Sequence, residues 1–254
     1  MSWEAFEKNG YGVFRADDMA PLDELRRQIF AKTRDIFGLD GDDPGVAFNS
    51  FHKLSITGAK LNELRVKLIR EVTDSVDSGT LIFKAFQNTL LTLLGPDLLV
   101  QKNTNLVIQQ PNDPNPSELH RDAPANSPYE IVVWLPLVDC FATKSMYILN
   151  REKTAKALSK LDTAPENWAD FHDYCLETGD NVPAPYGTAL LFWTGLFHGS
   201  RVNAEKETRF SLNMRYKSLF SPGGLKEPFE FFKIFRTSPL TRLGLEFQKS
   251  EAIR

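Results

Sequence analysis

The strongest constraint on the fold is a change of hydrophobic period near Leu98. Before this residue, apolar side chains recur every three or four positions, which is typical of amphipathic helices. After it, apolar and polar residues tend to alternate, and a period of two is typical of half-buried strands. The pattern therefore predicts a helical first part of the chain and a mainly β second part.

In the first part, the apolar spacing predicts a strand at Tyr11–Arg15 and helices at Asp17–Phe37, Leu61–Val72 and Leu81–Leu94. Proline suits the first turn of the first helix, and glycine follows the end of the first and third helices. The acidic run GLDGDDPG after the first helix resembles part of a calcium loop. It lacks the glutamate that ends the twelve-residue pattern, so we expect a solvated turn.

In the second part, period-two segments alternate with two helical stretches. The expected strands are Leu98–Gln110, Glu130–Leu137, Ser145–Leu149, Thr188–Phe197 and Arg209–Phe220, and the expected helices are Ala155–Leu161, Glu166–Leu176, Phe229–Phe235 and Pro239–Lys249. We find no repeat or linker. We therefore expect a single domain over residues 1–254, with helical support in 1–97, a β core in 98–220 that carries an insertion at 151–186, and C-terminal helices in 221–254.

Composition excludes several classes of function. The 254 residues are enough for one large domain, and 42% hydrophobic with 25% charged residues is typical of a globular protein. A net charge of −3 gives no electrostatic basis for binding nucleic acid or an anionic membrane. No apolar run reaches the roughly 18 residues of a membrane helix. The N-terminus has no apolar signal core, and the only cysteines are Cys140 and Cys175, so we expect a cytoplasmic protein.

The residues with the clearest chemistry are two histidines and an aspartate. His120 and Asp122 lie two positions apart beside a predicted strand, so their side chains can point to the same side of an extended chain. His198 ends another apolar, strand-like run. Two imidazoles and one carboxylate on one face of a metal leave other positions open, which is the arrangement that suits non-haem Fe(II) and O2. Taken singly, Asp122 could instead cap a turn and His120 could be an ordinary surface histidine.

A candidate anion site follows the second histidine. Arg209 and Ser211 share one face of the last long strand, and a buried arginine beside a hydroxyl suits a carboxylate through charge-assisted hydrogen bonds. Arg201 and Arg215 are alternatives for this role. Arg215 is separated from Arg209 by an even number of residues, so it is expected on the same face, nearer the rim.

The order and strand pattern of His120-x-Asp122, His198 and Arg209-x-Ser211 resemble those of the Fe(II)/2-oxoglutarate-dependent oxygenases. The run HGSRVNAEKETRFSLNMRY is especially similar to the phytanoyl-CoA-dioxygenase-like branch, which has His-Gly-Ser near its second histidine ligand and an arginine further along. The resemblance covers roughly Leu98–Phe220. There is also a similarity to oxygenases from bacterial carbohydrate-biosynthesis gene clusters, which suggests a sugar or sugar derivative as substrate.

The resemblance implies a mainly β fold with flanking helices, built on a double-stranded β-helix, or jelly-roll, with the metal at its open end. It implies that His120, Asp122 and His198 are the catalytic iron ligands. The cosubstrate 2-oxoglutarate would be bound by Arg209 with help from Ser211 or Ser200, and lined by Gln109 and Trp134. The implied reaction uses O2 to hydroxylate a C–H bond of a small-molecule substrate, with release of succinate and CO2. Related halogenases leave the place of the carboxylate to a halide, so Asp122 favours hydroxylation.

Three other functions fit the sequence less well. A cupin-type metal enzyme without 2-oxoglutarate would need three histidines and a glutamate, and no third histidine has suitable spacing. An inactive jelly-roll binding module would be expected to lack a ligand or the arginine. A protein hydroxylase would need an extended peptide groove. The sequence does not fix the oligomeric state, and a homodimer is compatible with it.

The remaining candidate positions are less specific. The run ATKSMYILNREKTAKAL stands where many relatives carry a Gly-rich turn and a P-G-S-H-like stretch, and the insertion Arg151–Tyr186 is expected to form a lid or rim. His172 is expected on a helix surface, and His52 in the core, on the surface or in the substrate pocket. Tyr147 and Asn150 lie where the barrel mouth is expected, and Cys140 is expected to be a small core residue.

Overall fold

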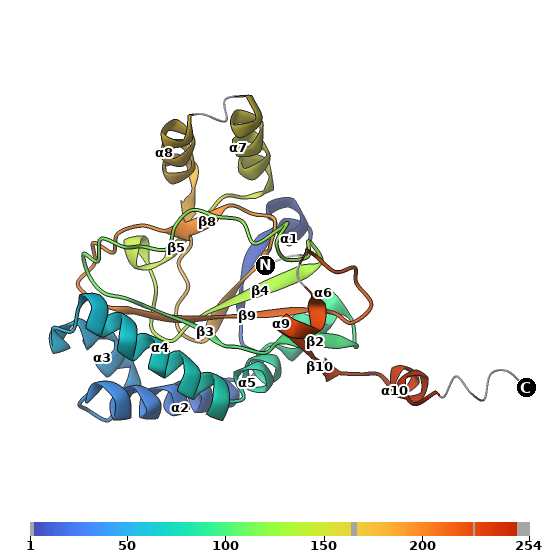
Figure 1. The fold of residues 1–254 in the computed structure, drawn as a ribbon, viewed down its shortest axis with the longest axis horizontal. Coiled ribbons are helices and arrows are strands. Elements are labelled where there is room, and N and C mark those ends of the chain that lie inside the picture. Colours follow the sequence, from blue (N-terminus) through green and yellow to red (C-terminus); the bar gives the residue numbers. More distant parts are fainter. Residues whose placement is uncertain (1–2, 164–166, 226, 248–254) are drawn as a thin grey trace, which may run out of the picture.

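The structure is a computed structural model that describes residues 3–163, 167–225 and 227–247. Figure 1 shows a layer of helices from the first part of the chain beneath the strands of the second part. The first part contains α1 (Trp3–Asn9), β1 (Tyr11–Arg15), α2 (Ala20–Phe37), α3 (Pro44–Asn49), η1 (Phe51–Leu54), α4 (Gly58–Ser75), α5 (Ser78–Ala85) and α6 (Gln87–Leu94). The strand and the first two helices predicted from the sequence are confirmed.

The helical part differs from the sequence prediction at two places. The single helix expected at Leu81–Leu94 is two helices, because Phe86 leaves the helical conformation and buries its ring completely. The acidic turn leads directly into the unpredicted helix α3. There the Asp43 carboxylate accepts hydrogen bonds from the backbone N–H groups of Gly45 and Val46, which caps the helix.

The second part forms two antiparallel sheets. The larger sheet has the strand order β1-β7-β4-β9-β2-β10, with β3 also paired to β9, and the smaller one has the order β6-β5-β8. The new strands are β2 (Leu98–Gln101), β3 (Asn105–Gln109), β4 (Glu130–Pro136), β5 (Met146–Ile148), β6 (Asp180–Asn181), β7 (Thr188–Trp193), β8 (His198–Ser200), β9 (Arg209–Ser218) and β10 (Phe232–Arg236). The remaining helices are η2 (Ala142–Lys144), α7 (Arg151–Thr163), α8 (Trp168–Thr178), α9 (Pro228–Phe231) and α10 (Pro239–Glu246).

One strand prediction and one helix prediction are wrong in detail. The strand expected at Leu98–Gln110 is broken after Gln101, and its halves, β2 and β3, pair with different stretches of β9. The helix expected at Phe229–Phe235 is only the short α9, because Phe232–Arg236 pairs with β2 as an edge strand. The C-terminal region 221–254 is therefore not purely helical. The expected helix at Pro239–Lys249 is described to Glu246, and positions 166 and 248–254 lie outside the described residues.

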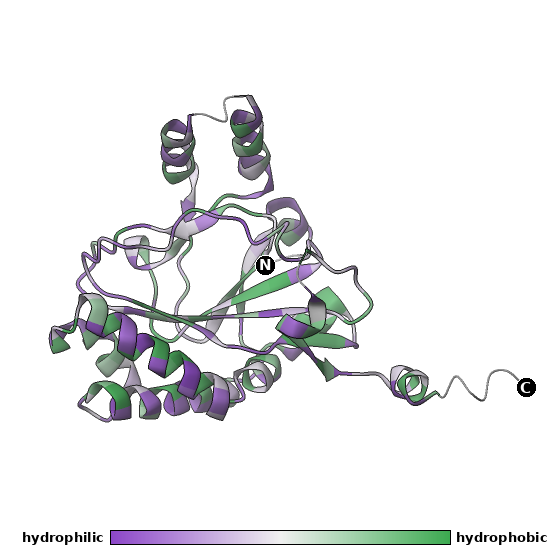
Figure 2. Cartoon of the chain, in the orientation of Figure 1, coloured by the Kyte–Doolittle hydropathy of each residue, from purple (hydrophilic) through white to green (hydrophobic). Residues whose placement is uncertain are grey.

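The central strand β9 has one face in the apolar core and one face that carries the polar residues of the candidate site. Its residues Phe210, Leu212, Met214 and Tyr216 are buried on one face, where Phe210 stacks on Phe48 of α3 with ring centroids 4.3 Å apart. Figure 2 shows mixed polar and apolar residues around α2 and α4 and apolar residues along β4. The alternate residues Arg209, Ser211, Asn213 and Arg215 occupy the opposite face of β9. Because the helical layer buries the apolar face, the other face can hold polar groups.

The two sheets face each other across this polar side. Arg209 on β9 donates a hydrogen bond from Nη2 to the Ser200 hydroxyl on β8 at 2.8 Å. The ring centroid of Phe192 on β7 lies 4.7 Å from that of His198 on β8. The polar face of β9 therefore points into the space between the sheets.

The predicted insertion is a helical hairpin, α7 and α8, that projects from the small-sheet end of the molecule (Figure 1). The hairpin shares a second apolar cluster with residues beside the histidines. The buried members of this cluster are Leu119, Tyr147, Leu149, Ala157, Phe171, Cys175 and Phe197. The hairpin therefore supports the segments that precede His120 and His198. Within the described ranges, no helix has the length and apolar character needed to cross a membrane.

The stacking of Phe48 and Phe210 gives a stability prediction. Truncation of a fully buried phenylalanine costs about 3–5 kcal/mol, so Phe210→Ala is expected to lower the free energy of unfolding by that amount. Urea unfolding at equilibrium measures it. The control is Phe220→Ala, which changes a side chain that is 72% exposed and should alter stability by no more than about 0.5 kcal/mol. Equal effects of the two variants would contradict this account of the core.

Candidate metal centre

The structure brings together the three residues that the sequence singled out as metal ligands. One nitrogen or oxygen from each of His120, Asp122 and His198 lies within 4.8 Å of the others. His198 Nε2 is 4.0 Å from Asp122 Oδ2, and the two imidazole centroids are 4.2 Å apart. Among the described residues, this is the only group of three or more histidine, cysteine or acidic side chains arranged to hold a metal ion.

Backbone pairing explains why the two histidines meet. His120 and His198 form an antiparallel bridge in which each N–H donates to the carbonyl oxygen of the other at 3.0 Å. Residues paired in this way project their side chains to the same face of a sheet. The bridge adds the His120 segment to the edge of β8, so two distant parts of the chain present their imidazoles side by side.

Both imidazoles are held in the tautomer that suits a metal ligand. His120 Nδ1 is 2.8 Å from the carbonyl oxygen of Glu118, and His198 Nδ1 is 3.0 Å from that of Leu196. A carbonyl oxygen only accepts, so each Nδ1 must carry the hydrogen and donate it. Each Nε2 is then left with its lone pair. Such backbone contacts commonly orient metal-binding histidines.

The buried environment also favours neutral imidazole. Burial, and to a smaller extent the neighbouring His120, lower the pKa of His198 to about 4. His198 is therefore unprotonated at neutral pH, and its Nε2 lone pair is available to a metal without loss of a proton.

The Asp122 carboxylate is held by Arg215 through the oxygen that does not face His198. Arg215 on β9 donates a hydrogen bond from Nη2 to Asp122 Oδ1, while Oδ2 is the oxygen that faces His198. Both side chains are largely buried. Each carboxylate oxygen thus has a different neighbour.

Arg209 is a buried cation with unused donors. Its Nη2 donates to Ser200, but Nε and Nη1 have no hydrogen-bond partner among the described residues. Burial lowers the pKa of its guanidinium to about 10. An unpaired buried charge is costly, so this group is expected to bind an anion. Ser200 lies two residues after His198 on β8, which places the contact beside the group of His120, Asp122 and His198.

The other predicted cosubstrate residues lie around Arg209. Gln109 is its register partner on β3, and the Gln109 amide nitrogen donates to the carbonyl oxygen of Arg201 at 2.6 Å. The guanidinium carbon of Arg209 is 6.0 Å from the ring centroid of Trp134. Ser211 Oγ and Gln109 Oε1 are buried without a partner among the described residues. These atoms supply further donors and acceptors beside the arginine.

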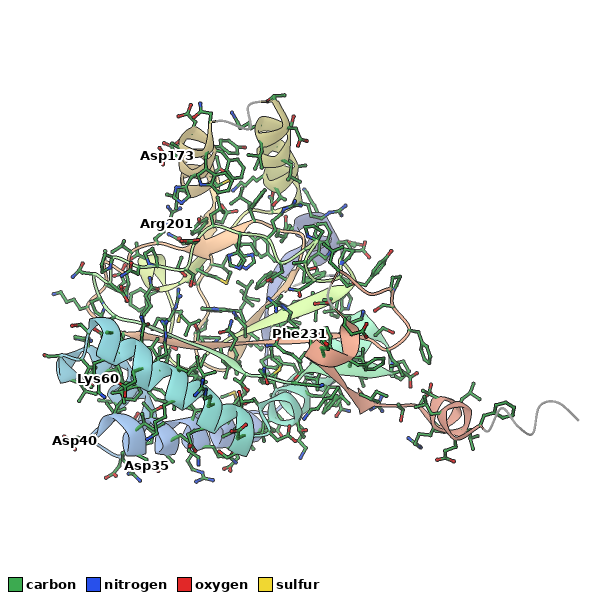
Figure 3. All side chains as sticks on the ribbon, viewed as in Figure 1. Asp35, Asp40, Lys60, Asp173, Arg201 and Phe231 are labelled. Carbon is green, nitrogen blue, oxygen red and sulfur yellow. The ribbon has the colours of Figure 1, made fainter. Side chains whose placement is uncertain are left out.

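The two alternative arginines are already engaged by the protein. Arg215 is paired with Asp122. Arg201, labelled in Figure 3 near the base of α8, donates from Nε to Asn181 Oδ1 at 3.1 Å and from Nη2 to the carbonyl oxygen of Leu176. Of the three candidates, Arg209 has the most unsatisfied donors.

The other singled-out residues lie elsewhere. His52 Nδ1 hydrogen bonds with the Thr208 hydroxyl at 3.1 Å, and His172 is partly exposed on α8, as predicted. Cys140 is buried, as predicted, and burial raises the pKa of its thiol to about 12. Tyr147 is not at an open mouth, because it is buried in the hairpin cluster.

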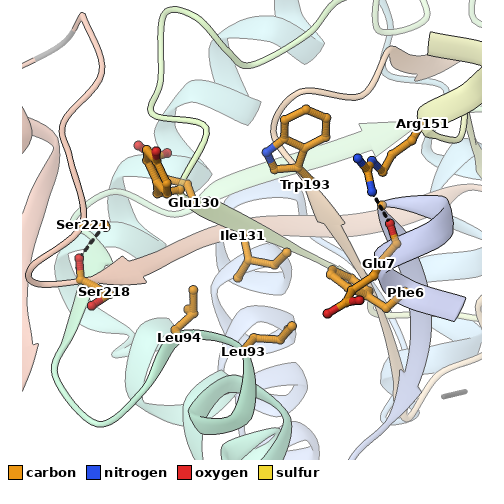
Figure 4. A pocket seen from close by; sticks show the side chains of 12 residues that line it. Phe6, Glu7, Leu93, Leu94, Glu130, Ile131, Arg151, Trp193, Ser218 and Ser221 are labelled. Atoms are coloured by element: carbon orange, nitrogen blue, oxygen red, sulfur yellow. Dashed lines mark hydrogen bonds between the residues drawn. The ribbon is translucent and has the colours of Figure 1, made fainter. Parts of the chain in front are cut away.

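A pocket of about 430 Å³, drawn in Figure 4, has none of His120, Asp122 and His198 in its lining. Among its lining residues are Phe6, Leu93, Ile131 and Trp193, and none of the predicted site residues lines it. Ile131 and Trp193 are register partners that alternate with Val132 and Phe192. The pocket therefore lies on the face of the sheet opposite to the one that contacts His198.

Sequence reasoning missed how Arg215 acts on the site. Its even spacing from Arg209 correctly indicated a shared strand face, but not that its partner is Asp122. The same spacing also places Asn213 on this face, where its Oδ1 is buried without a partner among the described residues. The backbone partners of the imidazoles leave no signal in the sequence, because any residue supplies a carbonyl oxygen.

Comparison with known proteins identifies the fold. No protein-family model and no curated protein matches the chain. Solved structures do match: the non-heme monooxygenase ThoJ, as its Ni complex, is 19% identical with a TM-score of 0.57 over 92% of this chain and 83% of that one. SnoK, a non-heme alpha-ketoglutarate-dependent carbocyclase from nogalamycin biosynthesis, is 16% identical with a TM-score of 0.54 over 92% and 96%. EctD from S. alaskensis is 14% identical with a TM-score of 0.53 over 92% and 84%.

These matches confirm the fold predicted from the sequence. The chain combines helices with facing antiparallel sheets and shares the jelly-roll fold of these proteins. In the structure, the three clustered side chains lie on the smaller sheet and beside it.

The lowered pKa of His198 predicts how the metal-free protein responds to acid. The unfolded chain takes up a proton near pH 6.5, whereas the folded imidazole stays neutral until about pH 4. The stability from the neutral form is therefore complete above pH 6.5 and is lost as the pH falls towards 4. His198→Gln is expected to reduce this dependence, measured by urea unfolding in chelator. His172→Gln is the exposed control, and an unchanged pH dependence in His198→Gln would contradict the assignment.

Proposed function

We propose that this protein is an Fe(II)- and 2-oxoglutarate-dependent dioxygenase that hydroxylates a C–H bond of a small-molecule substrate. The observation that carries the proposal is the pairing of two features. One is the group of His120, Asp122 and His198. The other is the buried guanidinium of Arg209, which donates a hydrogen bond to Ser200 on β8, the strand that also carries His198.

The donor set fits a non-haem iron. His120 Nε2, His198 Nε2 and Asp122 Oδ2 would hold the metal, and three protein ligands leave other coordination positions open. When bound, the iron and 2-oxoglutarate supply an O2-dependent oxidation with release of succinate and CO2. The contribution of the protein is to orient the ligands, limit the access of water and position the substrate.

The surroundings of Arg209 fit the distal carboxylate of 2-oxoglutarate. A carboxylate accepts charge-assisted hydrogen bonds from a guanidinium, and Nε and Nη1 of Arg209 have no protein partner in the described residues. Ser211 Oγ is a third buried donor without a partner, and Ser200 already contacts the arginine. Gln109 and Trp134 would line the same site. Binding here would satisfy a charge that the fold leaves buried.

The names of the structural neighbours support the same proposal. SnoK is described as alpha-ketoglutarate dependent, ThoJ as a non-heme monooxygenase, and EctD from S. alaskensis has also been solved with bound Fe. These enzymes share the fold of this chain. The sugar or sugar-derived substrate suggested by the sequence stays a prediction.

The alternative functions are less well supported by the site. No third histidine joins the group among the described residues, which disfavours a cupin-type centre. The chain keeps Arg209 and all three candidate ligands, His120, Asp122 and His198, which disfavours an inactive binding module. We also propose that the chain acts as one oxygenase domain, because one apolar cluster joins the N-terminal helices to the larger sheet.

The proposal predicts O2-dependent turnover of 2-oxoglutarate. Anaerobic protein with Fe(II) and 2-oxoglutarate should develop a visible charge-transfer band, and admission of O2 should release succinate. Asp122→Ala should lose both signals, because one ligand is removed. Failure of the unmodified protein to bind either Fe(II) or 2-oxoglutarate would contradict the proposal.

The carboxylate site is tested separately from the metal site. Arg209→Gln is expected to weaken 2-oxoglutarate binding at saturating metal by roughly tenfold or more, because a charge-assisted contact contributes about 1.5–3 kcal/mol. Metal affinity without 2-oxoglutarate should be unchanged. Calorimetric titration measures both. If Arg209→Gln lost metal binding and kept 2-oxoglutarate binding, this assignment of Arg209 would be wrong.

A further inference from the structure

A carboxylate can bind a metal through one oxygen or through both, and the choice changes how many coordination positions remain. At this site, one oxygen of Asp122 is already engaged by a neighbouring side chain. We propose that Arg215 is a positioning residue that fixes Asp122 with only Oδ2 directed to the metal. The proposal rests on the metal-binding function proposed above.

The contact itself is direct and well placed. Arg215 Nη2 donates to Asp122 Oδ1, and Oδ2 of the same carboxylate faces His198 Nε2. The Asp122 side chain is 7% exposed and that of Arg215 is 15% exposed. A charged pair shielded in this way is less weakened by solvent than a surface pair. The guanidinium therefore restrains the rotation of the carboxylate.

The fold holds Arg215 from three sides. Its backbone is fixed in the centre of the large sheet, where it is the register partner of Val132 on β4 and belongs to the same strand face as Arg209. Its guanidinium carbon lies 5.5 Å from the ring centroid of Phe231 on α9, which Figure 3 labels. The nearby carboxylate of Glu130 interacts with Arg215 electrostatically, and burial raises the pKa of Glu130.

Pro222 and Gly224, which follow β9, pack closely against neighbouring residues. Lys217 Nζ and Ser127 Oγ both donate to the carbonyl oxygen of Pro222, at 2.9 and 2.7 Å. A Cβ atom at Gly224 would lie 2.6 Å from the backbone of Asn126 and Ser127, so only glycine fits there without a shift. These contacts join Pro222 and Gly224 to the loop that follows Asp122.

The orientation of Asp122 determines how many coordination positions of a bound metal would stay open. With Asp122 bound through one oxygen, the protein would supply three ligand atoms to a metal and would leave its other coordination positions open for cosubstrate and O2. A carboxylate free to turn could occupy a fourth position. Arg215 would therefore maintain both the affinity for metal and the number of open positions, without contacting metal, cosubstrate or substrate.

Two arginines on one strand face allow a matched test. We expect Arg215→Gln to weaken Co(II) binding, measured by calorimetry without 2-oxoglutarate, by about 10- to 100-fold, the usual effect of losing a partner of a metal ligand. Arg209→Gln should bind Co(II) like the unmodified protein. Arg215→Lys keeps the charge and one donor and should recover part of the loss. The Co(II) absorption spectrum should also change in Arg215→Gln and not in Arg209→Gln.

A double-mutant cycle shows whether Arg215 acts through Asp122. In an Asp122→Asn background, adding Arg215→Gln should cause little further loss of Co(II) affinity. An equal loss in both backgrounds, or unchanged Co(II) affinity and spectrum in Arg215→Gln, would overturn the proposal. Circular dichroism checks folding. If Arg215→Gln does not fold, Arg215→Lys is the deciding variant, and an unaltered Co(II) affinity in Arg215→Lys would also overturn the proposal.

The same titrations separate this inference from the proposed function. If the unmodified protein binds Co(II) and loses affinity in Arg215→Gln but does not bind 2-oxoglutarate, the oxygenase proposal fails and the role of Arg215 stands. If 2-oxoglutarate binds as expected and Arg215→Gln leaves Co(II) binding intact, only the role of Arg215 fails. Absence of metal binding by the unmodified protein would overturn both.

Discussion

The reciprocal backbone hydrogen bonds between His120 and His198 are the interaction on which the site depends. They bring together two segments that are far apart in the chain and set both imidazoles on one side of the smaller sheet. Carbonyl oxygens two residues upstream then orient each ring through its Nδ1. Because these contacts involve backbone atoms, the position of the site follows from strand pairing and not from the side chains of neighbouring residues.

The second requirement is a strand whose two faces have different roles. One face of β9 buries Phe210 and Tyr216 in the main apolar core. The other face carries Arg209 and Arg215, which would be costly to bury without partners. Arg215 has its partner in Asp122, whereas Arg209 retains unsatisfied N–H groups. The helical layer supplies the stability that allows this polar face, and the polar face supplies the chemistry.

The sequence predicted the parts of the structure that depend on local patterns. Strand periodicity placed Arg209 and Arg215 on one face, and the spacing of His120 and Asp122 allowed them to converge. It did not predict the break at Phe86 or the edge strand β10, because both depend on packing against distant segments. The same limit applies to the site. Residue types indicate which side chains can bind a metal, but only the tertiary structure shows that Asp122 is also the partner of Arg215.

The most direct test of the account is a crystal structure of anaerobic protein with Fe(II) and 2-oxoglutarate, with anomalous data at the iron edge. The account predicts one peak bonded to Nε2 of both histidines and to a single oxygen of Asp122, with the distal carboxylate of 2-oxoglutarate on Arg209. A peak bonded to other residues, or an iron that leaves either histidine unbound, would contradict it.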